Sequence, residues 1–210
     1  TIDGGNDDDV VTLVTDAGAS SAVSVANVET VNGGAGDDVI TYTTNTTATV
    51  DGAGGNDTLN LATGGQTVSV ANVETVNGGS GNDVVTFTAA AAATVNGSTG
   101  NDSVTLGDFV NALTLTGVET VTGGTLADTI TSDHALGLAN LGEGADTLSV
   151  TGTAANDDIT ITVNGAGGND SITLTTSGAT GLISATIDGG NDDDVVTLVT
   201  DAGASSAVSV

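Results

Sequence analysis

The chain of 210 residues has no lysine, arginine, proline, cysteine, methionine or tryptophan, one tyrosine and two phenylalanines. The absence of lysine and arginine excludes ion pairs with those residues. With 27 acidic residues and a formal net charge of −27, nucleic acid and anionic membrane surfaces are excluded as electrostatic partners. No apolar run approaches the roughly 18 residues of a transmembrane helix, so we expect no membrane insertion.

The scarcity of large side chains argues against an ordinary globular core. The apolar residues are Val, Ala, Ile and Leu, and 32 glycines stand with Thr, Asn and Asp. Val, Ile and Thr favour strands, whereas Gly, Asn and Asp favour turns. Disorder is the alternative for an acidic, glycine-rich chain, but the periodic β-branched residues favour an all-β fold.

The beginning of the chain returns unchanged at its end, where residues 186–210 repeat residues 1–25. We call this segment the terminal repeat, and residues 1–185 the repeat unit. Chance and convergence do not produce such identity. We therefore expect slightly more than one unit of a tandem array, whose partners are identical units joined end to end. The functional object is then a long fibre or stalk.

A second period lies inside the repeat unit. The sequence VSVANVETVNGG at residues 23–34 recurs at 68–79, and a diverged copy, LTLTGVETVTGG, occupies 113–124. This 45-residue spacing defines modules near 23–67, 68–112 and 113–157, followed by a diverged remainder near 158–207. Searching for such repeats comes first in a sequence of this kind, because a fixed period indicates a solenoid or an array.

A shorter Gly–Asp motif recurs within the modules, roughly Val-Asn/Asp-Gly-x-x-Gly-Asn/Asp-Asp-x-aliphatic-Thr. The intervals between its aspartates are unequal, and merging the two shortest, on either side of Asp157, leaves eight intervals in the repeat unit. One motif turn per coil predicts eight coils, which rise about 38 Å at a strand spacing of ~4.8 Å. The motif aspartates are Asp9, Asp38, Asp57, Asp83, Asp102, Asp128, Asp146, Asp157, Asp170 and Asp194.

Strict alternation follows each motif and puts aliphatic residues on one face of a strand and threonines on the other. Residues 1–210 are therefore predicted to form one continuous β-solenoid, a parallel β-helix without significant helix. Tyr42 and Phe87, one module apart, are expected to stack as core neighbours. The inward residues on the first wall are Ile40, Tyr42, Val85, Phe87, Ile172 and Leu174, and on the second Val28, Val31, Ala48, Val50, Ala93 and Val95.

The Gly–Asp motif resembles the calcium-binding repeat of RTX proteins, Gly-Gly-x-Gly-x-Asp-x-aliphatic. The ANVETVN stretches are similar to segments of bacterial S-layer and giant repetitive surface proteins. The resemblance implies a β-solenoid, secretion to the cell surface and a structural or adhesive role. The motifs depart from RTX repeats because they are not consecutive nonapeptides. Two copies match in full: Gly33, Gly34 and Gly36 with Asp38, and Gly78, Gly79 and Gly81 with Asp83.

The chemistry of the motif independently favours Ca²⁺, which takes six to eight oxygen ligands from carboxylates and backbone carbonyls. Stacked aspartates would form a column of mutually repelling carboxylates, and a cation between coils would reverse that repulsion. The alternative is a metal-free turn, in which Asp and Asn cap backbone N–H groups. The aspartates expected to bind calcium are Asp9, Asp38, Asp57, Asp83, Asp102, Asp128, Asp170 and Asp194, whereas Asp146 and Asp157 are expected in solvated turns.

These features predict a calcium-stabilised structural segment of an extracellular fibre, stalk or surface layer. The alternatives are an extender region of a large bacterial adhesin and, less favoured, an ice-binding solenoid with flat threonine arrays. No catalytic function is predicted, because no acid and nucleophile stand out from the repeat. His134 is the only histidine and is expected in a loop, and Glu29, Glu74 and Glu119 recur once per module and are expected on a solvated surface.

Overall fold

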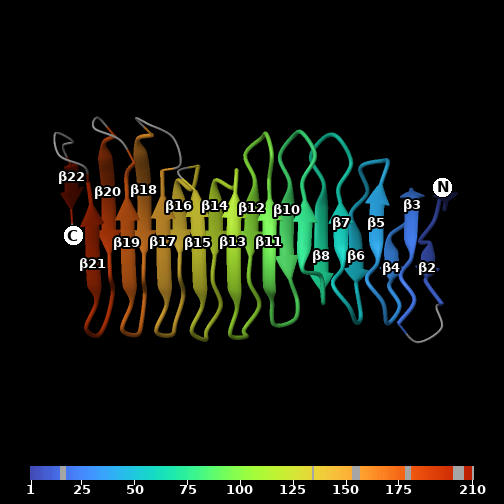
Figure 1. Cartoon of the computed structure of the whole chain (residues 1–210), viewed down its shortest axis with the longest axis horizontal. Helices are drawn as coiled ribbons and strands as arrows, with labels where there is room; N and C mark the ends of the chain where they lie inside the picture. Colours follow the sequence, from blue (N-terminus) through green and yellow to red (C-terminus); the bar gives the residue numbers. More distant parts are fainter. Residues whose placement is uncertain (15–17, 134, 153–156, 178–180, 201–205, 210) are drawn as a thin grey trace.

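The chain forms two parallel β-sheets in a computed structural model that describes residues 1–14, 18–133, 135–152, 157–177, 181–200 and 206–209. His134 lies outside the described residues. Each sheet has eleven strands, and no helix of the described residues is long and apolar enough to cross a membrane. We call the sheets odd and even after their strands (Figure 1).

The strands of the odd sheet are β1 (Ile2–Asp3), β3 (Ala22–Ala26), β5 (Val39–Tyr42), β7 (Thr58–Asn60), β9 (Thr75–Asn77), β11 (Ala92–Asn96), β13 (Ala112–Thr116), β15 (Thr129–Asp133), β17 (Thr147–Thr151), β19 (Ser171–Thr175) and β21 (Val195–Val199). The strands of the even sheet are β2 (Val10–Thr12), β4 (Thr30–Asn32), β6 (Ala48–Asp51), β8 (Thr67–Ala71), β10 (Val84–Phe87), β12 (Ser103–Thr105), β14 (Thr120–Thr122), β16 (Leu138–Asn140), β18 (Ile159–Asn164), β20 (Ile183–Asp188) and β22 (Ser206–Ser209).

The chain alternates between the sheets, so that one strand with its turn is a half-coil and two strands complete a coil. Every pairing is parallel and joins strands of adjacent coils. The coil length varies: Ala22 pairs with Val39 across a short coil, whereas Leu138 pairs with Thr162 across a longer one. The termini lie at opposite ends of the elongated stack (Figure 1). The prediction of a continuous all-β solenoid is confirmed.

The core is a narrow apolar layer between the two sheets. The alternation of side chains puts Ile40 and Tyr42 inside at 1% and 2% exposure, while Thr43 remains exposed. Val28, Val31 and Val50 of the facing wall are fully buried, and every residue predicted to point inward is buried. The predicted division between the walls is wrong for the second module, because Val85 and Phe87 lie in β10 of the even sheet and Ala93 and Val95 in β11 of the odd sheet. Small β-branched side chains are enough here because each wall contributes a single layer.

The prediction of eight coils per unit is wrong. Residues 2–3 form β1 and their copies, residues 187–188, lie in β20, so one repeat unit advances nineteen half-coils, or nine and a half coils. The reason is that the longest motif intervals, such as that from Asp9 to Asp38, span three half-coils and not one coil. The turns in between, where no motif aspartate stands, carry Glu29, Glu74 and Glu119.

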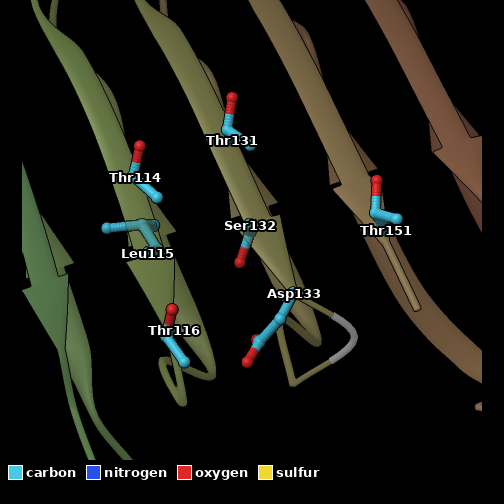
Figure 2. A pocket seen from close by; sticks show the side chains of 7 residues that line it. All are labelled: Thr114, Leu115, Thr116, Thr131, Ser132, Asp133 and Thr151. Atoms are coloured by element: carbon cyan, nitrogen blue, oxygen red, sulfur yellow. The ribbon is translucent and has the colours of Figure 1, made fainter. Parts of the chain in front are cut away.

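Successive modules begin on opposite sheets, because each module spans five half-coils. Tyr42 therefore lies in β5 of the odd sheet and Phe87 in β10 of the even sheet. Both are buried, but they are not neighbours in a ladder, and the predicted stacking is wrong. The third equivalent position is Ser132, which lines an open pocket of about 200 Å³ together with Leu115, Asp133 and neighbouring threonines (Figure 2).

Candidate functional site

Nine of the ten motif aspartates stand immediately before strands, on both sides of the solenoid, and Asp157 stands two residues before β18. The sequence predicted one column, but the structure forms two. We call these the odd row and the even row after the strands that follow them. The odd row holds Asp38, Asp57, Asp128, Asp146, Asp170 and Asp194, and the even row holds Asp9, Asp83 and Asp102.

Within a row, the backbone N–H of one residue donates a hydrogen bond to a carboxylate of the next coil. The Asp38 N–H reaches Asp57 Oδ1 at 2.7 Å, and the Asp83 N–H reaches Asp102 Oδ1 at 2.7 Å. The longest run follows Asp128, through Asp146 at 2.7 Å, Asp170 at 2.9 Å and Asp194 at 3.0 Å. One carboxylate oxygen per aspartate therefore caps the preceding coil without metal, as the alternative interpretation of the motif required.

Other polar residues donate the first hydrogen bond to a run of row aspartates, and glutamates accept hydrogen bonds from row aspartates in the same way. Ser21, Gln66 and Asn111, each one module apart, donate their N–H groups to Asp38, Asp83 and Asp128 at 2.7, 2.8 and 3.0 Å. Glu29, Glu74 and Glu119 accept the N–H groups of Asp9, Asp57 and Asp102 at 2.9, 2.7 and 2.6 Å. The prediction of a solvated surface role for these glutamates is wrong, because they are half-buried row members. The recurrence of one glutamate per module was the feature of the sequence from which their place in the rows could have been predicted.

Three aspartates have both oxygens engaged, and we call them the capped aspartates. The second oxygen, Oδ2, accepts the backbone N–H of the residue four positions earlier in the same turn. The donor distances are 2.7 Å from Gly34 to Asp38, 3.1 Å from Gly79 to Asp83 and 3.2 Å from Gly124 to Asp128. The two full motif matches of the sequence, those of Asp38 and Asp83, belong to this capped class.

A second set, the open aspartates, has a buried Oδ2 that accepts no hydrogen bond. The cause is the residue four positions earlier, which adopts a left-handed conformation. Ala53, at φ 69°, directs its N–H to Asp51 Oδ1 at 2.9 Å and not to Asp57. Ser98, at φ 69°, likewise donates to Asn96 Oδ1 at 3.1 Å. The open aspartates are Asp9, Asp57, Asp102, Asp146 and Asp170.

Asp146 corrects a prediction made from the sequence. A solvated turn was expected there, but Asp146 is 1% exposed and its Oδ2 is buried. Gly142, four residues earlier, has φ 98°, as the open class requires. Asp157, for which a solvated turn was also expected, is half-buried.

Oδ2 of four open aspartates, Asp9, Asp57, Asp102 and Asp170, shares its surroundings with a backbone carbonyl of the next coil. A Cβ at Gly52 would overlap the carbonyl oxygen of Asn72 and lie 2.5 Å from Asp57 Oδ2. A Cβ at Gly97 would likewise overlap the carbonyl oxygen of Gly117 and lie 2.5 Å from Asp102 Oδ2. A carboxylate oxygen that accepts no hydrogen bond and a backbone carbonyl oxygen therefore lie on the same side of each of these glycines, where their negative charges repel. A proton or a cation relieves that repulsion.

Burial raises the pKa of four open aspartates, Asp57, Asp102, Asp146 and Asp170. It is the largest effect on Asp57, whose pKa rises from 3.8 to about 6, and on Asp146, whose pKa rises from 3.8 to about 7. Burial raises the pKa of Asp102 and Asp170 in the same direction. The hydrogen bond from the preceding coil opposes the shift, and neighbouring carboxylates reinforce it. At Asp57 and Asp146 the buried environment therefore favours the protonated carboxyl more than water does.

The motif glycines permit close contact between coils. Gly33 and Gly78 lie against the carbonyl oxygens of Gly52 and Gly97, where a Cβ would not fit. Gly34 and Gly79 donate to the capped aspartates. Gly36 packs on the backbone of Ala19, and Gly81 on that of Gly64 and Gly65 with φ 114°.

The candidate ligand atoms around the open aspartates are oxygens, the type that Ca²⁺ prefers over softer metals. Among the described residues, no three His, Cys, Asp or Glu side chains form a group able to hold a metal ion. A cation at this site would rest on one carboxylate, backbone carbonyls and water. No protein family, curated protein or solved structure matches the chain.

Proposed function

We propose that the chain is a structural segment of an extracellular fibre or surface layer, in which repeat units continue one solenoid end to end. One observation supports this most strongly. Residues 1–25 and their identical copy at 186–210 form corresponding strands at the two ends: β1 matches the end of β20, β2 matches β21, and β3 matches β22. The copy already extends both ladders beyond one unit.

Both ends of the stack leave strands with one neighbour. In the odd sheet these are β1 and β21, and in the even sheet β2 and β22. Open strand edges template further pairing, and an adjoining unit of the same sequence provides strands of the same pattern. Continuation of the ladder therefore satisfies both ends with no other partner.

Arrays of one, two and four repeat units, each followed by the terminal repeat, test the proposal. Each added unit is expected to lengthen a rod of constant cross-section by about 46 Å, for nine and a half coils at ~4.8 Å. Small-angle scattering and electron microscopy measure the length. Beads joined by flexible segments, with no linear increase in rod length, would contradict a continuous fibre.

We further propose that Ca²⁺ binds at the open aspartates, where it neutralises Oδ2 next to a backbone carbonyl. Asp9, Asp57, Asp102 and Asp170 are the predicted calcium ligands with this geometry, and Asp146 is the fifth open aspartate. The capped aspartates Asp38, Asp83 and Asp128 have no free oxygen for a metal, so their role is to cap turns. Calcium would relieve repulsion in a chain without lysine or arginine.

Calorimetric titration of the chelator-treated chain with CaCl₂ tests this second proposal. The variant Asp57→Asn with Asp102→Asn removes two open carboxylates, and Asp38→Asn with Asp83→Asn removes two capped ones as the matched control. We expect the first variant to lose two sites and the control to retain them. Equal loss in both variants, or no heat from the parent chain at millimolar calcium, would overturn it.

A further inference from the structure

The two copies of the terminal repeat lie on opposite sheets. Ile2 is in β1 of the odd sheet, whereas its copy Ile187 is in β20 of the even sheet. Val10 is in β2 of the even sheet, whereas its copy Val195 is in β21 of the odd sheet. The repeat therefore returns after a half-integral number of coils.

The same sequence folds alike on either sheet. The left-handed turn at Gly5 and Asp7, with φ of 97° and 106°, recurs at Gly190 and Asp192 with 94° and 80°. The modules behave in the same way. The turn residues Asn27, Asn72 and Gly117 have φ of 49°, 51° and 59° and follow β3 of the odd sheet, β8 of the even sheet and β13 of the odd sheet. The half-coil is thus the structural unit, and the two sheets are interchangeable environments.

The odd number of half-coils has a simple origin in the sequence. Each module contributes five half-coils, and the diverged remainder contributes four longer ones. The lengthening is visible in the pairing of Ser171 with Val195 in the remainder, against that of Val84 with Ser103 within a module. Three modules and the remainder therefore give nineteen half-coils, and an even count would require one module more or fewer.

We propose that each unit of the array joins the next with a half turn about the fibre axis. This inference rests on the proposed fibre. The partner is a second copy of this repeat, whose odd strands continue the even sheet and whose even strands continue the odd sheet. Any surface of a unit, including each carboxylate row and the Ser132 pocket, then appears alternately on the two sides of the fibre. Like surfaces on one side recur every two units, about 91 Å apart at ~4.8 Å per coil.

A single reporter per unit makes the arrangement visible. The chain has no cysteine, so Thr114→Cys gives one thiol per unit on the exposed outer face of β13. Arrays of several units, labelled with a maleimide gold cluster, are imaged along straight rods. We expect labels on alternate sides, with successive labels about 46 Å apart along the axis at ~4.8 Å per coil.

Removing one module from every unit is the control, because it changes the number of half-coils per unit from odd to even. Deleting residues 68–112 from every unit joins Thr67 to Leu113, the counterpart of Val68, and leaves fourteen half-coils. All labels should then lie on one side, about 34 Å apart at the same ~4.8 Å spacing. Deleting two modules, residues 23–112, leaves nine half-coils and should restore alternation. A gradual twist of the rod affects all three arrays, so their comparison isolates the half turn.

The outcomes separate this arrangement from the proposed fibre. Parent rods labelled on one side only, or a one-module deletion that still alternates, would overturn the half turn and leave the fibre intact. An array that forms no rod would overturn the fibre and the half turn together. If the deletion arrays fail to fold by circular dichroism, the side alternation of the parent rods decides the question.

Discussion

At the residue scale, one backbone conformation decides the chemistry of each aspartate. Where the residue four positions earlier is left-handed, as at Ala53, its N–H turns away and Asp57 stays open. Where it is Gly34, the N–H caps Asp38. The capped aspartates Asp38, Asp83 and Asp128 recur once per module after a Gly-Gly pair, but the turn of the open Asp9 also contains Gly-Gly, so the local motif alone does not separate the two classes. The motif aspartates could be predicted as a group, but not which of them retain a free oxygen.

In metal-free buffer, Asp→Asn substitution is expected to have opposite effects on stability in the two classes of aspartate. Asp57→Asn keeps an acceptor for the Asp38 N–H and supplies an NH₂ donor to the Asn72 carbonyl. We expect its melting temperature at pH 8 to rise by a few degrees. Asp38→Asn places an NH₂ against the Gly34 N–H and should cost about 1–3 kcal/mol for the unsatisfied donor. Thermal denaturation measures both, and a fall in the first variant equal to that in the second would contradict the distinction.

The raised pKa values predict that the metal-free chain loses stability as pH increases. Asp57 and Asp146 bind a proton in the folded state with pKa values of about 6 and about 7, against 3.8 for an unperturbed carboxyl. The fold favours the protonated form, so its stabilisation is complete below the unfolded pKa and is lost as pH rises through the folded values. Melting in chelator should be higher at pH 5 than at pH 8.

General repulsion among 27 acidic residues acts in the same direction, so a variant must separate the two causes. Asp57→Asn with Asp146→Asn removes the two titrating groups and leaves the other carboxylates. We expect this variant to show a flatter pH dependence of melting between pH 5 and pH 8. A slope identical to that of the parent would assign the effect to overall charge.

Glycine at the coil contact predicts a position-specific intolerance of alanine. A Cβ at Gly52 would overlap the Asn72 carbonyl oxygen, whereas at Gly54 the nearest atom lies 3.9 Å away. Gly52→Ala must therefore shift the backbone of the next coil, with an expected loss of about 1–3 kcal/mol, the usual range for overpacking. Gly54→Ala is the control and should change stability by less than about 0.5 kcal/mol. Chemical denaturation compares them.

At the element scale, the sequence predicts strands and their faces well because period-two alternation is a direct consequence of backbone geometry. The inward positions of Ile40, Val50 and Leu174 follow from it and are buried. The coil count fails because turns are chemically degenerate: Glu74 enters the row in place of a motif aspartate. In the first module, carboxylates of either kind stand directly before only three of the five strands, so counting carboxylates also falls short of the number of half-coils.

The equivalent core position of the three modules predicts a stabilising substitution. Tyr42 and Phe87 fill it, but Ser132 is small, carries a buried hydroxyl without a partner and lines the pocket of Figure 2. Ser132→Val removes that hydroxyl and adds apolar contact with Leu115, so we expect a gain of about 1–2 kcal/mol. Thr94→Val, on the exposed outer face of β11 and away from the pocket, is the control. A destabilised Ser132→Val chain would show that the hydroxyl is satisfied.

At the scale of the whole molecule, much of the negative charge is arranged along the two carboxylate rows. The odd and even rows put carboxylates in successive coils, and no lysine or arginine balances them. The described donors to these carboxylates are backbone N–H groups and the Asn111 side-chain amide, all of them uncharged. The half-coil construction distributes the repulsion over both sides of the rod, which favours a straight stack over one that bends away from a single charged edge.

This arrangement predicts that two salts of equal ionic strength stabilise the chain differently. NaCl screens exposed carboxylates over a Debye length of about 10 Å at 0.1 M, so melting in chelator should rise gradually with NaCl. CaCl₂ without chelator supplies the same screening and also a ligand for the open aspartates. It should therefore raise the melting temperature further and saturate at millimolar concentration, the usual range of extracellular calcium modules. MgCl₂ is the control, since it dehydrates reluctantly and suits these carbonyl-lined turns poorly. Identical curves for the three salts at matched ionic strength would reduce the role of calcium to screening, while the continuous ladder would still account for the rod.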